Sequence, residues 1–102
     1  MNVDQFCFEE ANKYPIQSGK LYFCHIFYIR DENQRRLNIE GVRDGELMNM
    51  VFLTLSEAVP YENIFTDLIS YRVKVLINNG IVGWISSIYF RNFKLLRDES
   101  QE

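Results

Sequence analysis

The alternation of apolar and polar residues predicts β-strands along most of this chain. It is clearest in the stretch from Tyr71 to Phe90, where aliphatic residues recur at every second position: Val73, Val75 and Ile77. Asn79-Gly80 follows, a dipeptide typical of tight hairpin turns, because both central positions of a type I′ turn favour residues that tolerate positive φ. The alternation then resumes, so we expect two strands folded back on each other as a β-ribbon.

Other stretches show similar strand patterns. Residues 20–30 and 47–55 are rich in aromatic and β-branched side chains, which suit a pleated surface. Residues 37–42 have a weaker strand-like pattern, residues 86–89 resemble a single 3₁₀ turn, and residues 90–96 would close the sheet. Short strands separated by turn residues indicate a sandwich or a barrel. About 75 residues suit a small barrel better, so we expect a mainly β fold with five strands.

Two segments do not fit the strand pattern. Residues 1–19 form a short N-terminal extension, either irregular or helical, with Asp4 as the N-cap and an end before Pro15. Residues 56–70 read either as a short helix begun by Pro60 or as an irregular loop. We therefore divide the chain into an extension (1–19), a barrel (20–96) and a polar tail (97–102) that we expect to be flexible.

Composition places the chain among globular proteins and argues against a nucleic-acid or membrane partner. The 102 residues are 47% hydrophobic and 15% aromatic, enough for the core of one domain. The net charge is −3, whereas nucleic-acid binders usually carry a basic excess that neutralises phosphates. The start of the chain lacks the basic and apolar regions of a signal peptide, and no apolar run is long enough to span a membrane. We expect a cytoplasmic protein.

The candidates for chemistry are few. Cys7, Cys24 and the single histidine, His25, do not form a spaced metal-binding motif, and adjacent strand residues such as Cys24 and His25 point to opposite faces. The carboxylates fall in loops, and no glycine-rich loop is present to bind phosphate. We therefore expect reduced cysteines, no metal, no cofactor and no enzymatic activity.

The end of the chain resembles an SH3 domain. The order of residues that carries the resemblance is Gly80, Gly83, Trp84, Ile85, Ser86, Ser87, Ile88, Tyr89 and Phe90. In SH3 domains this region runs as a hydrophobic strand, a turn that closes on glycine, and then glycine, an aromatic residue, an aliphatic residue, Pro, Ser, Asn, Tyr and Val. Residues 45–51 resemble the glycine-glutamate strand after the family's long loop, and residues 25–29 and 37–39 occupy the places of its first conserved motifs. The resemblance covers residues 21–96 and implies an SH3-like barrel.

The residues of the SH3 peptide groove are largely replaced. Tyr71 stands at the position of the groove tryptophan, Ser86 at that of the proline, and Phe27 and Ile29 at those of two tyrosines, whereas Tyr89 matches. SH3 domains use this groove for extended proline-rich peptides. The changes make binding of ordinary proline-rich peptides doubtful, although the fold does not determine the function.

From these patterns we expect a non-catalytic protein-interaction module, such as an accessory factor of a phage or bacterium. Its binding surface would consist of Phe27, Tyr71, Trp84, Ser86 and Tyr89, with Asp44 and Glu46 at the rim. The same apolar face would also suit association of two copies.

An alternative is a small-barrel nucleic-acid-binding protein. Its basic residues would be Arg30, Arg35, Arg36, Arg43, Arg72, Lys74, Arg91 and Lys94. Its stacking residues would be Tyr22, Tyr28 and Trp84.

Overall fold

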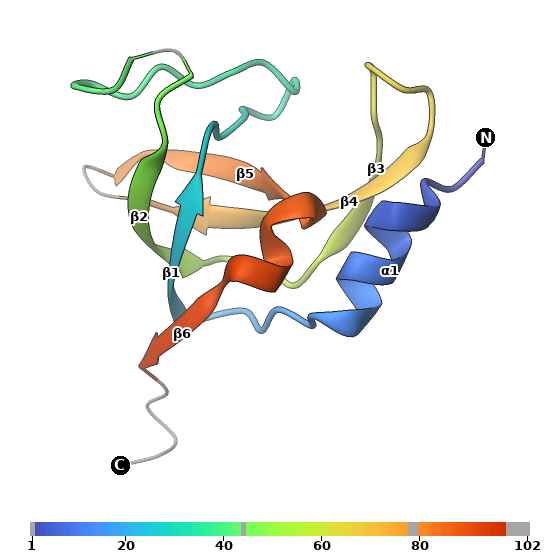
Figure 1. The fold of residues 1–102 in the computed structure, drawn as a ribbon, viewed down its shortest axis with the longest axis horizontal. Coiled ribbons are helices and arrows are strands. Elements are labelled where there is room, and N and C mark those ends of the chain that lie inside the picture. Colours follow the sequence, from blue (N-terminus) through green and yellow to red (C-terminus); the bar gives the residue numbers. More distant parts are fainter. Residues whose placement is uncertain (1, 44, 78–79, 98–102) are drawn as a thin grey trace.

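The computed structural model describes residues 2–43, 45–77 and 80–97. Within these residues the protein is mainly β, with six strands in one strongly curled antiparallel sheet, a short α-helix and a 3₁₀ helix (Figure 1). The strands are β1 (Leu21–Ile26), β2 (Met48–Thr54), β3 (Val59–Glu62), β4 (Ile69–Leu76), β5 (Val82–Ser86) and β6 (Lys94–Arg97). The helices are α1 (Gln5–Lys13) and η2 (Ser87–Asn92). The mainly β fold predicted from the sequence is confirmed.

The sheet has one strand more than the five expected. The additional strand, β3, lies in residues 56–70, so neither the helix nor the irregular loop expected there describes this segment. Pro60 is compatible with β3 because the strand pairs on one side only, with β4, and proline is tolerated at a sheet edge. Residues 37–42, with their strand-like pattern, form a connection with a turn at 40–41 instead.

The curl of the sheet brings distant parts of the chain together. β4 pairs with both β2 and β3 and also with β5, while β1 lies between β2 and β6. Beyond β1, Arg30 and Trp84 exchange two backbone hydrogen bonds, of 3.1 and 2.8 Å. This pair joins the chain after β1 to β5, so the sheet bends into a half-barrel.

The hairpin expected from the sequence is present. β4 pairs with β5 in a register that places Val73 opposite Ile85, and both side chains are fully buried. The central turn residues 78–79 lie outside the described residues, and the adjacent Gly80 has a φ of 75°. The expected 3₁₀ turn is also found, as the longer η2.

The core lies on the concave side of the sheet. Its largest fully buried side chains, Phe52 and Phe90, both contact Phe93, at ring-centroid distances of 4.9 and 5.4 Å. Burial of a side chain of this size contributes about 1.5–3 kcal/mol. These contacts hold η2, which follows β5, against the inner face of the sheet.

The N-terminal extension contains a helix. The Asp4 carboxylate accepts a hydrogen bond from the Cys7 amide at 3.1 Å, the expected N-cap, and the helix ends just before Tyr14-Pro15. Two backbone hydrogen bonds of 2.8 Å, Asp4 N to Ile69 O and Ile69 N to Asn2 O, fasten its start to β4. Figure 1 shows α1 beside η2 at one side of the half-barrel.

Candidate functional site

The described surface contains a pocket of about 300 Å³, which we call the loop pocket. It opens between two connections: residues 27–36, after β1, and residues 63–68, between β3 and β4. In Figure 1 both connections lie at the upper side of the half-barrel. The lining residues are Asp4, Cys7, Tyr28, Arg30, Gln34, Tyr61, Asn63, Phe65, Thr66, Arg72, Trp84, Ser86 and Ile88. A volume of 300 Å³ is at the lower end of the range for sites that bind small molecules or side chains.

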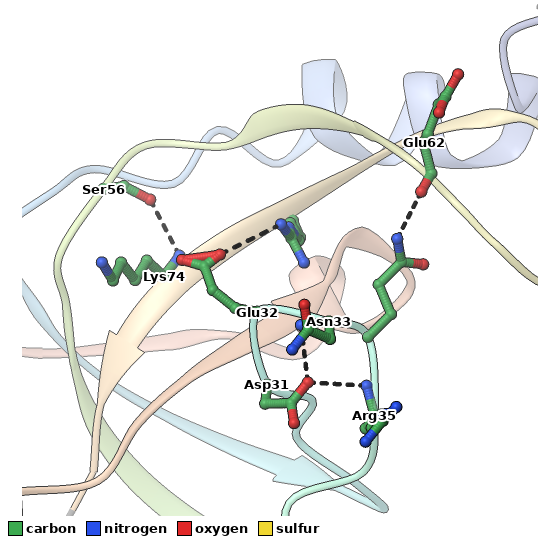
Figure 2. A network of polar contacts seen from close by, with 9 residues as sticks. Asp31, Glu32, Asn33, Arg35, Ser56, Glu62 and Lys74 are labelled. Atoms are coloured by element: carbon green, nitrogen blue, oxygen red, sulfur yellow. Dashed lines mark hydrogen bonds and ion pairs between the residues drawn. The ribbon is translucent and has the colours of Figure 1, made fainter.

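The first wall of the pocket is held in shape by Asp31. Its carboxylate Oδ1 accepts hydrogen bonds from the backbone amides of Asn33, at 2.8 Å, and Arg35, at 3.0 Å (Figure 2). Between these two residues Gln34 has a φ of 65°, a left-handed conformation that is uncommon for residues other than glycine. The turn is therefore specified by local hydrogen bonds, and it directs the Gln34 side chain toward the opposite wall.

Gln34 joins the two walls. Its side-chain nitrogen donates a hydrogen bond to the backbone carbonyl of Glu62 at 2.6 Å, and its side-chain oxygen accepts one from the Ile64 amide at 2.9 Å. Figure 2 shows the first of these bonds crossing from the 27–36 connection to the end of β3. Because one side chain makes both bonds, the mouth of the pocket is preformed.

Two arginines and four aromatic rings line the pocket. The Arg72 guanidinium carbon lies 4.1 Å from the centroid of the Trp84 ring and 4.6 Å from that of Tyr61. The Arg30 guanidinium carbon lies 4.5 Å from the Tyr28 ring and 4.7 Å from the Phe65 ring. Each guanidinium thus contacts two rings, in the range where cation–π attraction is appreciable.

At its inner end the pocket reaches the start of α1. Cys7 is buried there, and burial raises the pKa of its thiol, while nearby Ser87 and Ser70 hydroxyls act in the opposite direction. Burial also raises the pKa of the Tyr61 hydroxyl. A raised pKa keeps Cys7 in the thiol form, which is a weak nucleophile. The pocket therefore offers stacking surfaces and hydrogen-bond donors in preference to an activated nucleophile.

The structure brings two of the residues selected from the sequence into the loop pocket. Trp84 and Ser86 both belong to its lining. The Ser86 hydroxyl also accepts a hydrogen bond from the Ile88 amide at 3.4 Å, as the N-cap of η2.

The other three residues of the expected binding surface, Tyr71, Tyr89 and Phe27, lie outside the lining of the pocket. The Tyr71 ring packs against Phe8 of α1, at a centroid distance of 6.1 Å. Tyr89 is largely buried, and its hydroxyl accepts a hydrogen bond from the Phe27 amide at 3.4 Å. The Phe27 side chain is 47% exposed.

Glu46, one of the two acidic rim residues expected from the sequence, is not in the lining of the loop pocket either. Glu46 accepts a hydrogen bond from the Arg43 amide at 2.9 Å, within the connection before β2. Asp44 lies outside the described residues. Sequence reasoning did not select Gln34, Tyr61 or Phe65, because their role depends on two connections meeting in space, for which the local sequence contains no signal.

The remaining candidates for chemistry lie elsewhere. Cys24 is fully buried, and burial raises the pKa of its thiol to about 11. His25 is exposed on the convex face, where its Nδ1 forms a hydrogen bond with the Asn49 side chain. In the described part of the chain, no three His, Cys, Asp or Glu side chains gather as a metal site. No helix in that part is both long and apolar enough to cross a membrane.

A second surface feature is an apolar row on the convex face of the sheet. The strand register aligns its residues across four strands: Leu21, Leu53, Leu76 and Val82. Leu21 and Val82 are 38% and 42% exposed. None of these four residues lines the loop pocket, so the row is a separate feature.

Comparison of the chain with protein-family models, with curated proteins and with solved structures finds no match.

Proposed function

We propose that this protein is a non-catalytic interaction module that binds a segment of another protein in the loop pocket. The observation that carries the proposal is the combination, in one preformed cavity, of four aromatic rings with arginine side chains. Tyrosine, tryptophan and arginine are the side chains that dominate the binding energy of protein interfaces.

Preorganisation of the pocket supports this proposal. The Gln34 bridge and the Asp31 turn hold both walls before any ligand arrives. A preformed site does not have to order its own loops on binding, so more of the contact energy appears as affinity.

We further propose that the half-barrel is SH3-like. Three features support this: the pairing of β1 with β6, the β4–β5 hairpin, and the 3₁₀ helix η2 directly after β5. The loop pocket lies between the long connection after β1 and the connection before β4, and of the groove positions that the resemblance assigns it contains Ser86. Its different lining implies a different class of ligand from proline-rich peptides.

Selection from a random peptide display library tests the proposed function. We expect to select peptides that bind the wild-type protein with micromolar affinity. Their affinity for the Phe65→Ala variant should be lower by about 10-fold or more, since truncating an aromatic anchor commonly costs more than 1 kcal/mol. Phe65 lines the loop pocket and is 64% exposed, so its removal should leave the fold intact.

Phe27→Ala is the matched control. It makes the same chemical change at a side chain that is also exposed but lies outside the lining. Selected peptides that lose affinity with Phe27→Ala and retain it with Phe65→Ala would contradict the choice of pocket, as would a failure to select any peptide.

A nucleic-acid-binding function is the second candidate. It is favoured by the same arginines beside aromatic rings, since bases stack on such rings in single-stranded complexes. The net charge of −3 opposes it. A titration with a single-stranded oligonucleotide at low and high salt tests it, because binding through phosphates weakens steeply as salt rises.

A further inference from the structure

We propose that the loop pocket recognises a carboxylate on the bound protein segment, an Asp or Glu side chain with apolar neighbours, through Arg30 and Arg72. This inference rests on the proposed function and specifies the chemistry of its ligand.

The first support is the way the rings hold the two guanidinium groups. Arg72 lies against Trp84 and Tyr61, and Arg30 against Tyr28 and Phe65, with carbon-to-centroid distances from 4.1 to 4.7 Å. A cation–π contact is electrostatic and does not by itself occupy the N–H donors along the edges of the planar guanidinium group. Those edges match the two oxygens of a carboxylate.

The second support is unused hydrogen-bonding capacity. An arginine side chain carries five N–H donors. Within residues 2–43, 45–77 and 80–97, the Arg72 side chain donates no hydrogen bond, and its buried Nε has no partner. Arg30 uses Nη1 for the backbone carbonyl of Gln34 at 2.9 Å. A buried donor without a partner costs free energy, and a ligand that accepts hydrogen bonds near it recovers part of that cost.

The third support is a carboxylate of the protein itself that stands close to Arg72. Glu32 Oε2 lies 3.9 Å from Arg72 Nη2, beyond hydrogen-bond distance, and the Glu32 side chain is 65% exposed (Figure 2). An ion pair this long, with its carboxylate exposed, contributes little to stability. Glu32 can therefore give way to a ligand carboxylate, and it would compete with that ligand for Arg72.

The surroundings favour one carboxylate over a polyanion. Asp4 lines the same pocket, Glu32 stands at its edge, and the whole chain has a net charge of −3. Nucleic acids gain affinity by having many phosphates neutralised at once, which these acids oppose. Two arginines within an aromatic lining suit an acidic side chain flanked by apolar ones.

Two libraries of peptides with blocked termini test the inference. In one library a Glu is fixed among apolar residues, and in its twin that position is Gln. We expect the Glu peptides to bind more tightly than their Gln twins by about 10-fold or more, since hydrogen bonds to charged groups contribute about 1.5–3 kcal/mol. Equal affinity of the twin peptides would overturn the inference.

Variants of the protein sharpen the test. Arg72→Lys and Arg30→Lys keep the positive charge but remove the paired N–H donors of the guanidinium group. Each variant should therefore weaken binding of the Glu peptides about 10-fold and binding of the Gln peptides much less. Arg43→Lys, at a residue outside the loop pocket, is the matched control and should change neither affinity. Unchanged Glu-peptide binding by folded Arg72→Lys protein would contradict the inference.

Glu32→Gln should change the affinity for Glu peptides in the direction opposite to the arginine variants. Removing the competing carboxylate should raise the affinity for Glu peptides and leave the Gln peptides unchanged. This variant changes an exposed side chain, so it stays informative if Arg72→Lys fails to fold. An affinity for Glu peptides that falls or stays constant would count against competition at Arg72.

The outcomes separate this inference from the function on which it rests. Peptides that bind, lose affinity with Phe65→Ala and show no preference for Glu would refute the carboxylate site and leave the interaction module standing. Failure of every peptide would refute both. Salt-sensitive binding of a single-stranded oligonucleotide, tighter than that of any Glu peptide, would also overturn the inference and favour the nucleic-acid function.

Discussion

Gly83 shows how a single residue shapes the half-barrel. It lies in β5, where the segment after β1 crosses over the strand, and it is buried. A Cβ atom at this position would stand 2.3 Å from Ile29 Cγ2 and 2.8 Å from Leu37 Cδ1. These separations are shorter than van der Waals contact, so the close approach that allows Arg30 to pair with Trp84 requires glycine.

We expect Gly83→Ala to lower the free energy of unfolding by about 1–3 kcal/mol, the usual cost of overpacking a well-packed interior. Urea denaturation followed by circular dichroism measures it. Val82→Ala, at the next position and exposed, is the control and should cost less than about 1 kcal/mol. A Gly83→Ala protein as stable as the wild type would show that the segment after β1 can move away without cost.

At the scale of elements, α1 is attached to η2 through an ion pair whose carboxylate is buried. The Glu10 carboxylate accepts hydrogen bonds from Arg91 of η2, 2.7 Å from Nη2 and 3.1 Å from Nε. Glu10 is 4% exposed, and the hydrogen bonds from Arg91 lower the pKa of its carboxyl group. Because Cys7 of α1 and its N-cap Asp4 line the loop pocket, this ion pair also positions that end of the pocket.

We expect Glu10→Gln to lower the melting temperature at neutral pH. A carboxyl group whose pKa is lower in the folded state stabilises the fold fully above its unfolded-state pKa, about 4.3. That stabilisation is lost as the pH falls through the folded-state pKa. The difference in melting temperature between the two proteins should therefore be constant near neutral pH and narrow below about pH 4.

Glu9→Gln is the matched control, since Glu9 lies next to Glu10 on α1 but is exposed. It should change the melting temperature little at any pH, because exposed charge pairs contribute little. A Glu10→Gln difference that persists unchanged at low pH would show that the ion pair is not its source.

At the scale of the whole molecule, the sheet joins parts of the chain that are far apart in sequence. β6 pairs with β1, so Leu21 stands opposite Arg97, and β4 is paired with β2, β3 and β5. No pair of strands next to each other in sequence makes the half-barrel by itself. The fold should therefore form or break as one cooperative unit.

We expect urea unfolding to give the same midpoint by Trp84 fluorescence and by far-ultraviolet circular dichroism. Trp84, the single tryptophan, reports on the loop pocket, and circular dichroism reports on the entire chain. The free energy of unfolding should fall by at least about 1 kcal/mol per molar urea, as for other small domains. A fluorescence midpoint at lower urea would show that the pocket opens before the sheet unfolds.

Much of the fold is predictable because the signals are local. Alternation in residues 71–85, the turn dipeptide Asn79-Gly80 and the Asp4 N-cap each depend on a few neighbouring residues, and the elements around them are found where expected. Residues 56–70 are different, because their strand forms by pairing with β4 at an edge that accepts Pro60. A strand specified by its partner leaves a weak trace in its own sequence.

The residues of the candidate site show the same difference between local signals and tertiary packing. Trp84 and Ser86 were identified because they follow Gly83 in a recognisable order, and both line the loop pocket. The resemblance also selects Tyr71, Phe27 and Tyr89 as counterparts of groove residues, yet these three residues lie outside the lining of the pocket.

The sequence by itself therefore determined the mainly β class, the hairpin and the supply of aromatic side chains, whereas it left the N-terminal extension either helical or irregular. Only the tertiary structure decided which of those side chains share a cavity, and that Arg30 and Arg72 lie between aromatic rings within it. The physical reason is that local propensity acts over a few residues, whereas the loop pocket forms where the Gln34 side chain bridges two connections about 30 residues apart.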